Sequence, residues 1–140
     1  MKPVMDKGSL EKFLAQDFPQ VSGDFSIEDV VDMGCVVRLK VAEKHLRPGG
    51  TVSGPSMFAL ADVSIYLAIL AMIGPKALTV TTNCAIDFMR KPVAGADLIA
   101  HAKLHKLGRV LAVGDVLIYS DGQDAPVARA SLTYSIPPKG

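Results

Sequence analysis

The sequence contains no tryptophan, few other aromatic residues, only two cysteines and no excess of charge of one sign. Its 15 lysines and arginines nearly match its 14 aspartates and glutamates, and no basic run appears. The composition therefore gives no support for nucleic-acid binding. Cys35 and Cys84 lack the spacing of metal-binding or redox pairs, so we expect small buried side chains and predict neither a metal site nor a cofactor.

Signals for targeting, repeats and additional domains are also missing. The first residues carry no apolar signal region, and no internal repeat or low-complexity tract interrupts the chain. A chain of 140 residues is long enough to bury a core and short enough to form one domain. We therefore predict a single cytoplasmic domain over residues 1–140.

What the chain does have is one long apolar run, Gly54–Ile73, in which Asp62 is the only charge. Pro55 suits the first position of a helix, and Gly74 followed by Pro75 suits its end. A helix that is apolar on all sides is either a core helix or a membrane span. Asp62 would cost about 2.5–3.5 kcal/mol in the middle of a membrane, so we predict a core helix.

The segments around this helix have the patterns of one short helix and several strands. We expect the short helix over residues 9–17, capped by Ser9 and with three apolar residues on one face. Alternating or β-branched runs predict strands over residues 25–31, 35–41, 77–90, 97–107, 109–120 and 127–136. Asp121-Gly122 indicates a hairpin, and consecutive hairpins indicate an antiparallel sheet.

These elements predict an α+β fold in which an antiparallel sheet wraps one long helix. One sheet face covers one side of the helix at residues 54–73, so the other side needs a second partner. A symmetric copy of the chain supplies that partner most simply, and we predict an obligate homodimer. The sequence leaves open whether two dimers join into a tetramer.

Four segments carry a more specific signal. Residues 45–62 combine a glycine-rich loop, Ser53-Gly54-Pro55 at the start of the helix and Leu60-Ala61-Asp62 two turns later. The other three segments are residues 79–92, 107–116 and 121–128. In order and spacing, over roughly residues 30–136, they resemble the PaaI-like (phenylacetyl-CoA-type) acyl-CoA thioesterases, which have the hotdog fold.

The resemblance implies the hotdog fold and hydrolysis of an acyl-CoA thioester, with coenzyme A as part of the substrate. It also implies roles for three residues. The Gly54 N–H polarises the thioester carbonyl, and Asp62 is the general base on water or the nucleophile. The Thr81 hydroxyl on the following strand helps to place the water. The acyl group stays open, although Met57, Phe58 and Tyr66 suggest an apolar or aromatic one unless they belong to the core.

The chemistry of these residue types agrees with the implied roles. Free amides at a helix N-terminus favour an oxyanion, and glycine lets a ligand approach the backbone closely. Asp62 lies eight residues beyond Gly54, about 12 Å along the axis at about 1.5 Å per residue. One protomer therefore cannot bring both groups to one carbonyl. Two helices packed antiparallel about a two-fold axis would do so, giving two composite sites per dimer.

Three neighbours depart from the family's signature. Ser53 stands in place of a histidine, Pro55 in place of a second glycine, and Arg47 where the loop often has an asparagine. Ser53 can still cap the helix, whereas Pro55 has no N–H to give; Arg47 can pair with Asp62 of the second copy and weaken it as a base. A non-catalytic acyl-CoA binding or sensing protein therefore stays an alternative. A dehydratase of the same fold is a weaker one, since it needs a histidine and only His45 is near.

Four basic residues are expected to cluster near two strand ends, where they can meet the phosphates of coenzyme A: Arg90, Lys91, Lys106 and Arg109. Ordinary edge-strand charges that discourage aggregation explain them equally well. Asp87 faces away from the apolar side of its strand, and we expect it to be solvated or paired with Arg38 or Lys40.

The three histidines do not predict a metal site. His101 and His105 would lie about 13 Å apart on a strand at about 3.3 Å per residue, too far to share one ion. We interpret them as part of a solvated or interface face. His45 is expected to be a surface residue of its loop.

Overall fold

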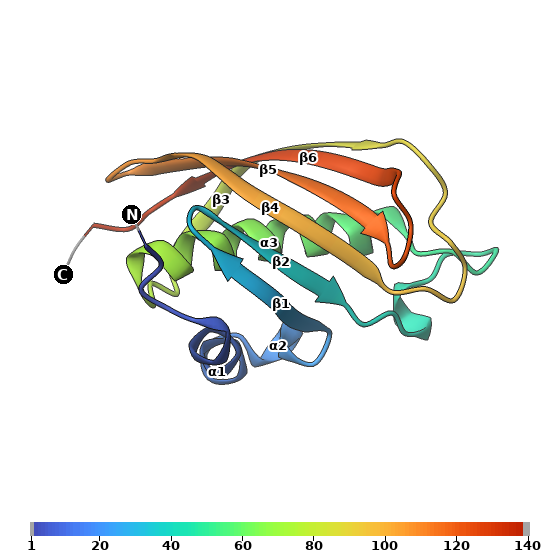
Figure 1. Cartoon of the computed structure of the whole chain (residues 1–140), viewed down its shortest axis with the longest axis horizontal. Helices are drawn as coiled ribbons and strands as arrows, with labels where there is room; N and C mark the ends of the chain where they lie inside the picture. The colour runs from blue at the N-terminus through green and yellow to red at the C-terminus, as the bar shows by residue number, and fades with distance from the viewer. Residues whose placement is uncertain (1, 139–140) are drawn as a thin grey trace.

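A six-stranded antiparallel sheet curls around one long helix, α3 (Gly54–Ile73), in the computed structural model, which describes residues 2–138 (Figure 1). The sheet has the strand order β1-β2-β4-β5-β6-β3. Its strands are β1 (Phe25–Val31), β2 (Gly34–Leu39), β3 (Val80–Phe88), β4 (Leu98–Leu107), β5 (Leu111–Ser120) and β6 (Pro126–Ser135). The short helices are α1 (Lys7–Asp17), α2 (Pro19–Ser22) and the 3-10 turn η1 (Glu43–His45).

Helix α3 begins and ends where the sequence predicts. The Ser53 side chain caps it by accepting a hydrogen bond from the Ser56 N–H. Gly74 ends it with a φ of 96°, a conformation that favours glycine. Pro55 is the second helical residue rather than the first, because the helix already begins at Gly54. Helix α3 is long and apolar enough for a membrane span, but most of it is buried inside the sheet, so it is a core helix.

The cover of α3 is more complete within one chain than the sequence suggested. The curvature of the sheet brings several strands onto the helix, and α1 packs against it as well. Helix α1 buries Leu10, Phe13 and Leu14, and it is capped by Asp6, whose carboxylate accepts from the Ser9 N–H. The prediction that Ser9 is the cap is therefore wrong by one turn. The helix therefore leaves little surface for a second copy, and a dimer would have to form through another surface of the chain.

That surface is the edge strand β3. The strands β4, β5 and β6 form the expected meander, but β3 crosses to the far side of β6 and has a free edge (Figure 1). Large apolar side chains remain exposed along it, among them Leu78 at 77%, Val80 at 52% and Phe88 at 52%. An open edge with exposed apolar side chains is a template for pairing with another chain.

A β-bulge in β3 decides which side chains face the helix. Its register against β6 shifts between Thr81 and Asn83. Thr81 is half-buried before the shift, and Cys84 and Ile86 are half-buried after it. In the sequence, the even-numbered residues from 78 to 88 alternate and predict one unbroken apolar face that includes Thr82. This is wrong because the extra residue reverses the alternation.

Candidate active site

Asp62, the only charge on α3, is held by two hydroxyl groups that both donate to the same carboxylate oxygen. Thr81 Oγ1 on β3 lies 2.5 Å from Asp62 Oδ1, and Tyr134 Oη on β6 lies 2.6 Å from it. The Tyr134 hydroxyl also lies 2.8 Å from the backbone carbonyl of Asp62, so its proton is shared between the two oxygens. Oδ2 has no hydrogen bond to any residue in the range 2–138 and stays available for other chemistry.

The charge on Asp62 acts on the titratable groups around it. Burial raises the pKa of Tyr134 far above its usual range, and the nearby Asp62 charge raises it further. Burial, then the charge of Asp62, also raises the pKa of the Cys84 thiol. Tyr134 therefore stays protonated at neutral pH and remains a hydrogen-bond donor to Asp62.

A cavity of about 500 Å³ opens beside Asp62. Its walls come from the α1–α2 junction, from α3, from the start of β3 and from β6. The lining residues include Asp17, Phe18, Gln20, Asp62, Val63, Tyr66, Leu78, Thr81 and Tyr134. The volume lies within the range of about 300–1,000 Å³ typical of small-molecule pockets. Asp62 thus lies in the wall of a space large enough for a ligand.

A second cavity, of about 310 Å³, lies at the N-terminus of α3. It is lined by Gly54 together with Arg47, Arg90 and Lys91, and by the ring of Phe88. The Gly54 N–H belongs to the first helical residue and has no partner among the described residues. A Cβ at Gly54 would come within 3.2 Å of Phe88 Cζ. Glycine therefore keeps this amide accessible in a place with three cationic side chains.

The other predicted site residues lie elsewhere. Ser53 is occupied as a cap, and neither it nor Pro55 is among the residues that line the second cavity. Arg109 lies beside Ile73, at the opposite end of α3 from Gly54. The expectation that Arg109 clusters with Arg90 and Lys91 is therefore wrong within one chain. The reason is that the β4–β5 hairpin and the segment after β3 end at opposite ends of the helix (Figure 1).

Two polar residues differ from their predicted surroundings. His45 is buried rather than at the surface: its Nδ1 accepts from the Ala42 N–H at 2.8 Å, and its Nε2 lies 3.6 Å from Asp24. It therefore anchors the loop before α3. Asp87 pairs with Arg129 at 2.9 Å and not with Arg38 or Lys40, because β6 and not β2 is its neighbour in the sheet.

Tyr134 is the site residue that sequence reasoning missed. It follows Asp62 by 72 residues, at the end of the alternating inward positions Ala128, Ala130, Leu132 and Tyr134 of β6. A tyrosine at an inward position needs a partner for its hydroxyl, and this was the available signal. Only the placement of β6 beside β3 shows that the partner is Asp62.

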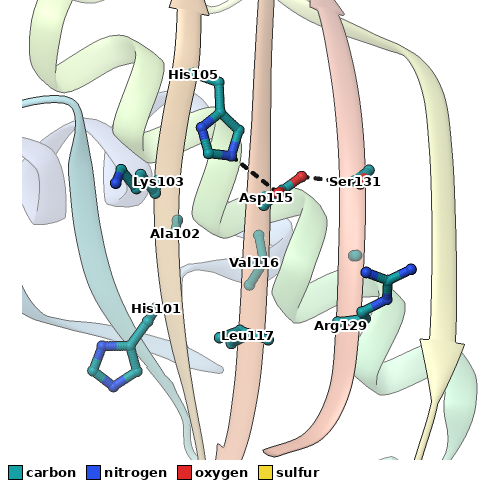
Figure 2. Close-up of a pocket in the computed structure, with 10 residues that line it drawn as sticks. His101, Ala102, Lys103, His105, Asp115, Val116, Leu117, Arg129 and Ser131 are labelled. Carbon is teal, nitrogen blue, oxygen red and sulfur yellow. Dashed lines mark hydrogen bonds and ion pairs between the residues drawn. The ribbon is translucent and has the colours of Figure 1, made fainter.

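Another carboxylate with two side-chain partners lies on the outer face of the sheet (Figure 2). His105 Nε2 lies 3.0 Å from Asp115 Oδ2, and Ser131 Oγ donates to Asp115 Oδ1 at 2.9 Å. The carboxylate stands between the histidine and the serine, so the imidazole cannot accept the serine proton, as activation of a nucleophile requires. His101 and Lys103 are also exposed in the single chain, as expected for the solvated or interface face that the sequence predicts.

Comparison with known proteins agrees with the fold. Residues 49–127 match the family model of the Thioesterase superfamily. The crystal structure of a putative thioesterase from Silicibacter sp. TM1040 is 59% identical, with a TM-score of 0.92, covering 99% of this chain and 96% of that one. A mutant of the phenylacetic acid degradation protein PaaI from Thermus thermophilus is 29% identical, with a TM-score of 0.73, covering 85% of this chain and 99% of that one.

A hypothetical thioesterase of Streptococcus pneumoniae TIGR4, whose structure was determined with coenzyme A, shares the fold at 23% identity. Its TM-score is 0.76, covering 93% of this chain and 98% of that one. Together with the family match and the sheet wrapped around α3, these likenesses confirm the resemblance seen in the sequence. The chain belongs to the thioesterase superfamily and has the hotdog fold.

Proposed function

We propose that the protein is an acyl-CoA thioesterase, which hydrolyses a CoA thioester to a free acid and coenzyme A. The main support for the proposal is the way in which the two carboxylate oxygens of Asp62 are hydrogen-bonded. Two hydroxyls fix Oδ1, while Oδ2, which has no hydrogen bond from the described residues, lies beside a cavity of about 500 Å³. An oriented carboxylate with one free oxygen suits a general base or a nucleophile.

The site needs the amide of a second copy. Within one chain, β3 passes Asp62 at Thr81 and passes Gly54 at Phe88. If the free edges of two β3 strands pair antiparallel about a two-fold axis near Cys84, Thr81 of one copy lies opposite Phe88 of the other. Asp62 of one copy then lies near Gly54 of the other. The proposed homodimer therefore holds two composite sites, each with a carboxylate and a helix-start amide.

The reaction follows from these positions. The thioester carbonyl oxygen accepts a hydrogen bond from the Gly54 N–H of one copy, with the dipole of α3 behind it. Water attacks the carbonyl carbon while Asp62 Oδ2 of the other copy accepts its proton. The C–S bond of the tetrahedral intermediate then breaks, and the coenzyme A thiolate takes up the proton held by Asp62. In the alternative, Oδ2 attacks the carbon itself, and the C–S bond breaks to release the coenzyme A thiolate. Water then hydrolyses the resulting anhydride, which frees Asp62 and supplies the proton for the thiolate.

Thr81 and Tyr134 act as positioning residues in this proposal. The family resemblance implies that the Thr81 hydroxyl places the water, but here it donates to Asp62 itself. Together with Tyr134 it fixes the plane of the carboxylate and presents Oδ2, which accepts no hydrogen bond from residues 2–138.

The cavity at the start of α3 has the positive charge expected of a binding site for the nucleotide end of coenzyme A. Arg47, Arg90 and Lys91 line it without any carboxylate among the lining residues, which suits phosphate groups. In the antiparallel dimer, Arg109 of the second copy approaches this end of the helix. The coenzyme A in the Streptococcus pneumoniae relative supports this class of ligand. Two free cysteines fit the proposed place of action in the cytoplasm.

The test is release of free thiol from a panel of acyl-CoA esters by the wild type and by Asp62→Ala, with circular dichroism to show that the variant is folded. We expect turnover by the wild type only. Equal release by both, or none by either, would contradict the proposal. One turnover in ¹⁸O-labelled water tests the nucleophilic route, because the label enters Asp62 only if an anhydride forms and water attacks its Asp62 carbonyl carbon.

A non-catalytic acyl-CoA binding protein is the second candidate, and Pro55 is the observation that favours it. Because proline has no N–H, the start of α3 offers the substrate one amide where the family's signature offers two. Calorimetry would select this candidate if acyl-CoA binds with micromolar affinity or better while the thiol assay stays at background.

A further inference from the structure

The two cavities beside α3 carry charges of opposite sign. The cavity at the start of the helix has three cationic side chains and no acidic one among its lining residues. The cavity beside Asp62 has two carboxylates, Asp17 and Asp62, and no lysine, arginine or histidine in its lining as far as residues 2–138 define it. A thioester has an anionic nucleotide end and an acyl end, so the two cavities distinguish the ends.

We infer that the cavity beside Asp62 receives the acyl group and selects neutral, apolar acyl groups of limited length, with Asp17 and Phe18 as the selecting residues. The inference rests on the proposed thioesterase function, because it assigns the two ends of that substrate. The inference goes beyond that function because it names the class of acyl group. The class is acyl chains with no charged end, as opposed to acyl groups that end in a second carboxylate.

The wall of the cavity opposite the reacting carboxylate is aromatic and fixed. Asp62, Val63 and Tyr66 lie on one face of α3, so an acyl chain that starts at Asp62 passes the Tyr66 ring. The Tyr66 hydroxyl donates to the Ala77 carbonyl at 3.0 Å, which fixes the ring. Phe18 packs against it edge to face, with ring centroids 6.1 Å apart. Phe18 therefore closes the path of a long chain.

Asp17 places a negative charge at the same end. Burial raises the pKa of Tyr66, and the charge of Asp17 raises it further, so the carboxylate acts on the space around this ring. A carboxylate at the far end of an acyl group would face Asp17 without a cation among the lining residues to compensate for it. Repulsion by Asp17 would exclude acyl groups that end in a carboxylate, although it adds no contact to uncharged acyl groups.

The charge test compares pentanoyl-CoA with glutaryl-CoA, which have the same chain length and differ in the terminal carboxylate. We expect the wild type to favour pentanoyl-CoA at least tenfold in kcat/KM, a difference of about 1.4 kcal/mol. Asp17→Asn should narrow this ratio about threefold or more. Glu11→Gln, on the exposed side of the same helix, is the matched control and should leave the ratio unchanged. Equal use of both esters by the wild type would overturn the inference.

The length test uses straight acyl-CoA esters from butyryl to dodecanoyl. We expect Phe18→Ala to move the best substrate toward longer chains by two or more carbons, while Phe18→Tyr keeps the wild-type optimum. An unchanged optimum in Phe18→Ala would overturn the role of Phe18. If no ester is hydrolysed at all, the thioesterase proposal fails separately. In that case, calorimetry can still measure the affinities for pentanoyl-CoA and glutaryl-CoA. Equal affinities for the two esters would contradict the proposed selection against a terminal carboxylate.

Discussion

Asp62 and Asp115 are both carboxylates with two side-chain partners, yet only the first has the surroundings of an active site. Asp115 is exposed, and its histidine and serine occupy one oxygen each (Figure 2). Asp62 is half-buried, and its two partners share one oxygen and leave the other free. The presence of aspartate, histidine and serine in contact is thus a poor guide to catalysis. The free oxygen and the greater burial of Asp62 separate the two places, because a cavity of about 380 Å³ adjoins Asp115 as well.

The largest expected effect tests that comparison directly. Asp62→Ala should lower the turnover of acyl-CoA about a thousandfold, because general base catalysis contributes about 10²–10⁴-fold. Asp115→Ala should stay within twofold of the wild type. Thiol-release assays on the two variants decide it, and a loss of similar size in both would show that the outer cluster takes part in the reaction.

The next effect concerns the composite site. Ala85→Lys on the exposed edge of β3 should bring two lysines together near the two-fold axis, prevent strand pairing and yield a monomer in sedimentation. Turnover should fall about a hundredfold, the cost of losing one oxyanion donor. Leu117→Lys, exposed on the outer face, is the control for the β3 pairing. A fully active monomeric Ala85→Lys variant would disprove the shared site.

A smaller effect is expected for the positioning hydroxyls. Tyr134→Phe should lower kcat about tenfold and leave KM within about twofold, since a hydrogen bond to a charged group contributes about 1.5–3 kcal/mol.

The matched variants for this prediction lie at Thr81. Thr81→Val should likewise lower kcat with little change in KM, and Thr81→Ser, which keeps the hydroxyl, should restore the wild-type kcat. If kcat of Tyr134→Phe equals that of the wild type, the hydroxyl has only a structural role.

The smallest effect is expected on the outer face. His105→Gln removes an exposed ion pair and should change the free energy of unfolding by no more than about 0.5 kcal/mol, because exposed pairs contribute little. Urea unfolding measures this. A loss of about 2 kcal/mol or more, beyond the usual range for exposed pairs, would show that the His105–Asp115 pair is structurally important.

The parts of the fold that follow local patterns could be predicted from the sequence. The ends of α3 follow from Ser53 and Gly74, and the β4–β5–β6 meander follows from alternation and from the Asp121-Gly122 turn, where Gly122 has a φ of 85°. The position of β3 could not be predicted, because a strand that crosses to a distant edge leaves no local signature.

The same limit applied to the site. Asp62 and Gly54 stand out in the sequence as the one charge and the first residue of an apolar helix. Their partners depend on long-range pairing. Tyr134 reaches Asp62 only through the contact of β6 with β3, and His45 becomes buried only because the loop before α3 folds toward Asp24.

The bulge in β3 makes the site depend on chain length as well as on side chains. With the extra residue, Thr81 faces Asp62, while the Thr82 hydroxyl is directed to the Thr133 carbonyl. A strand one residue shorter would have to give up either the Thr81 contact or the inward positions of Cys84 and Ile86. A single-codon deletion at residues 81–83 would therefore inactivate the enzyme while every residue assigned to binding or proton transfer remained in the gene. We therefore expect evolution to tolerate insertions and deletions in β3 less well than substitutions.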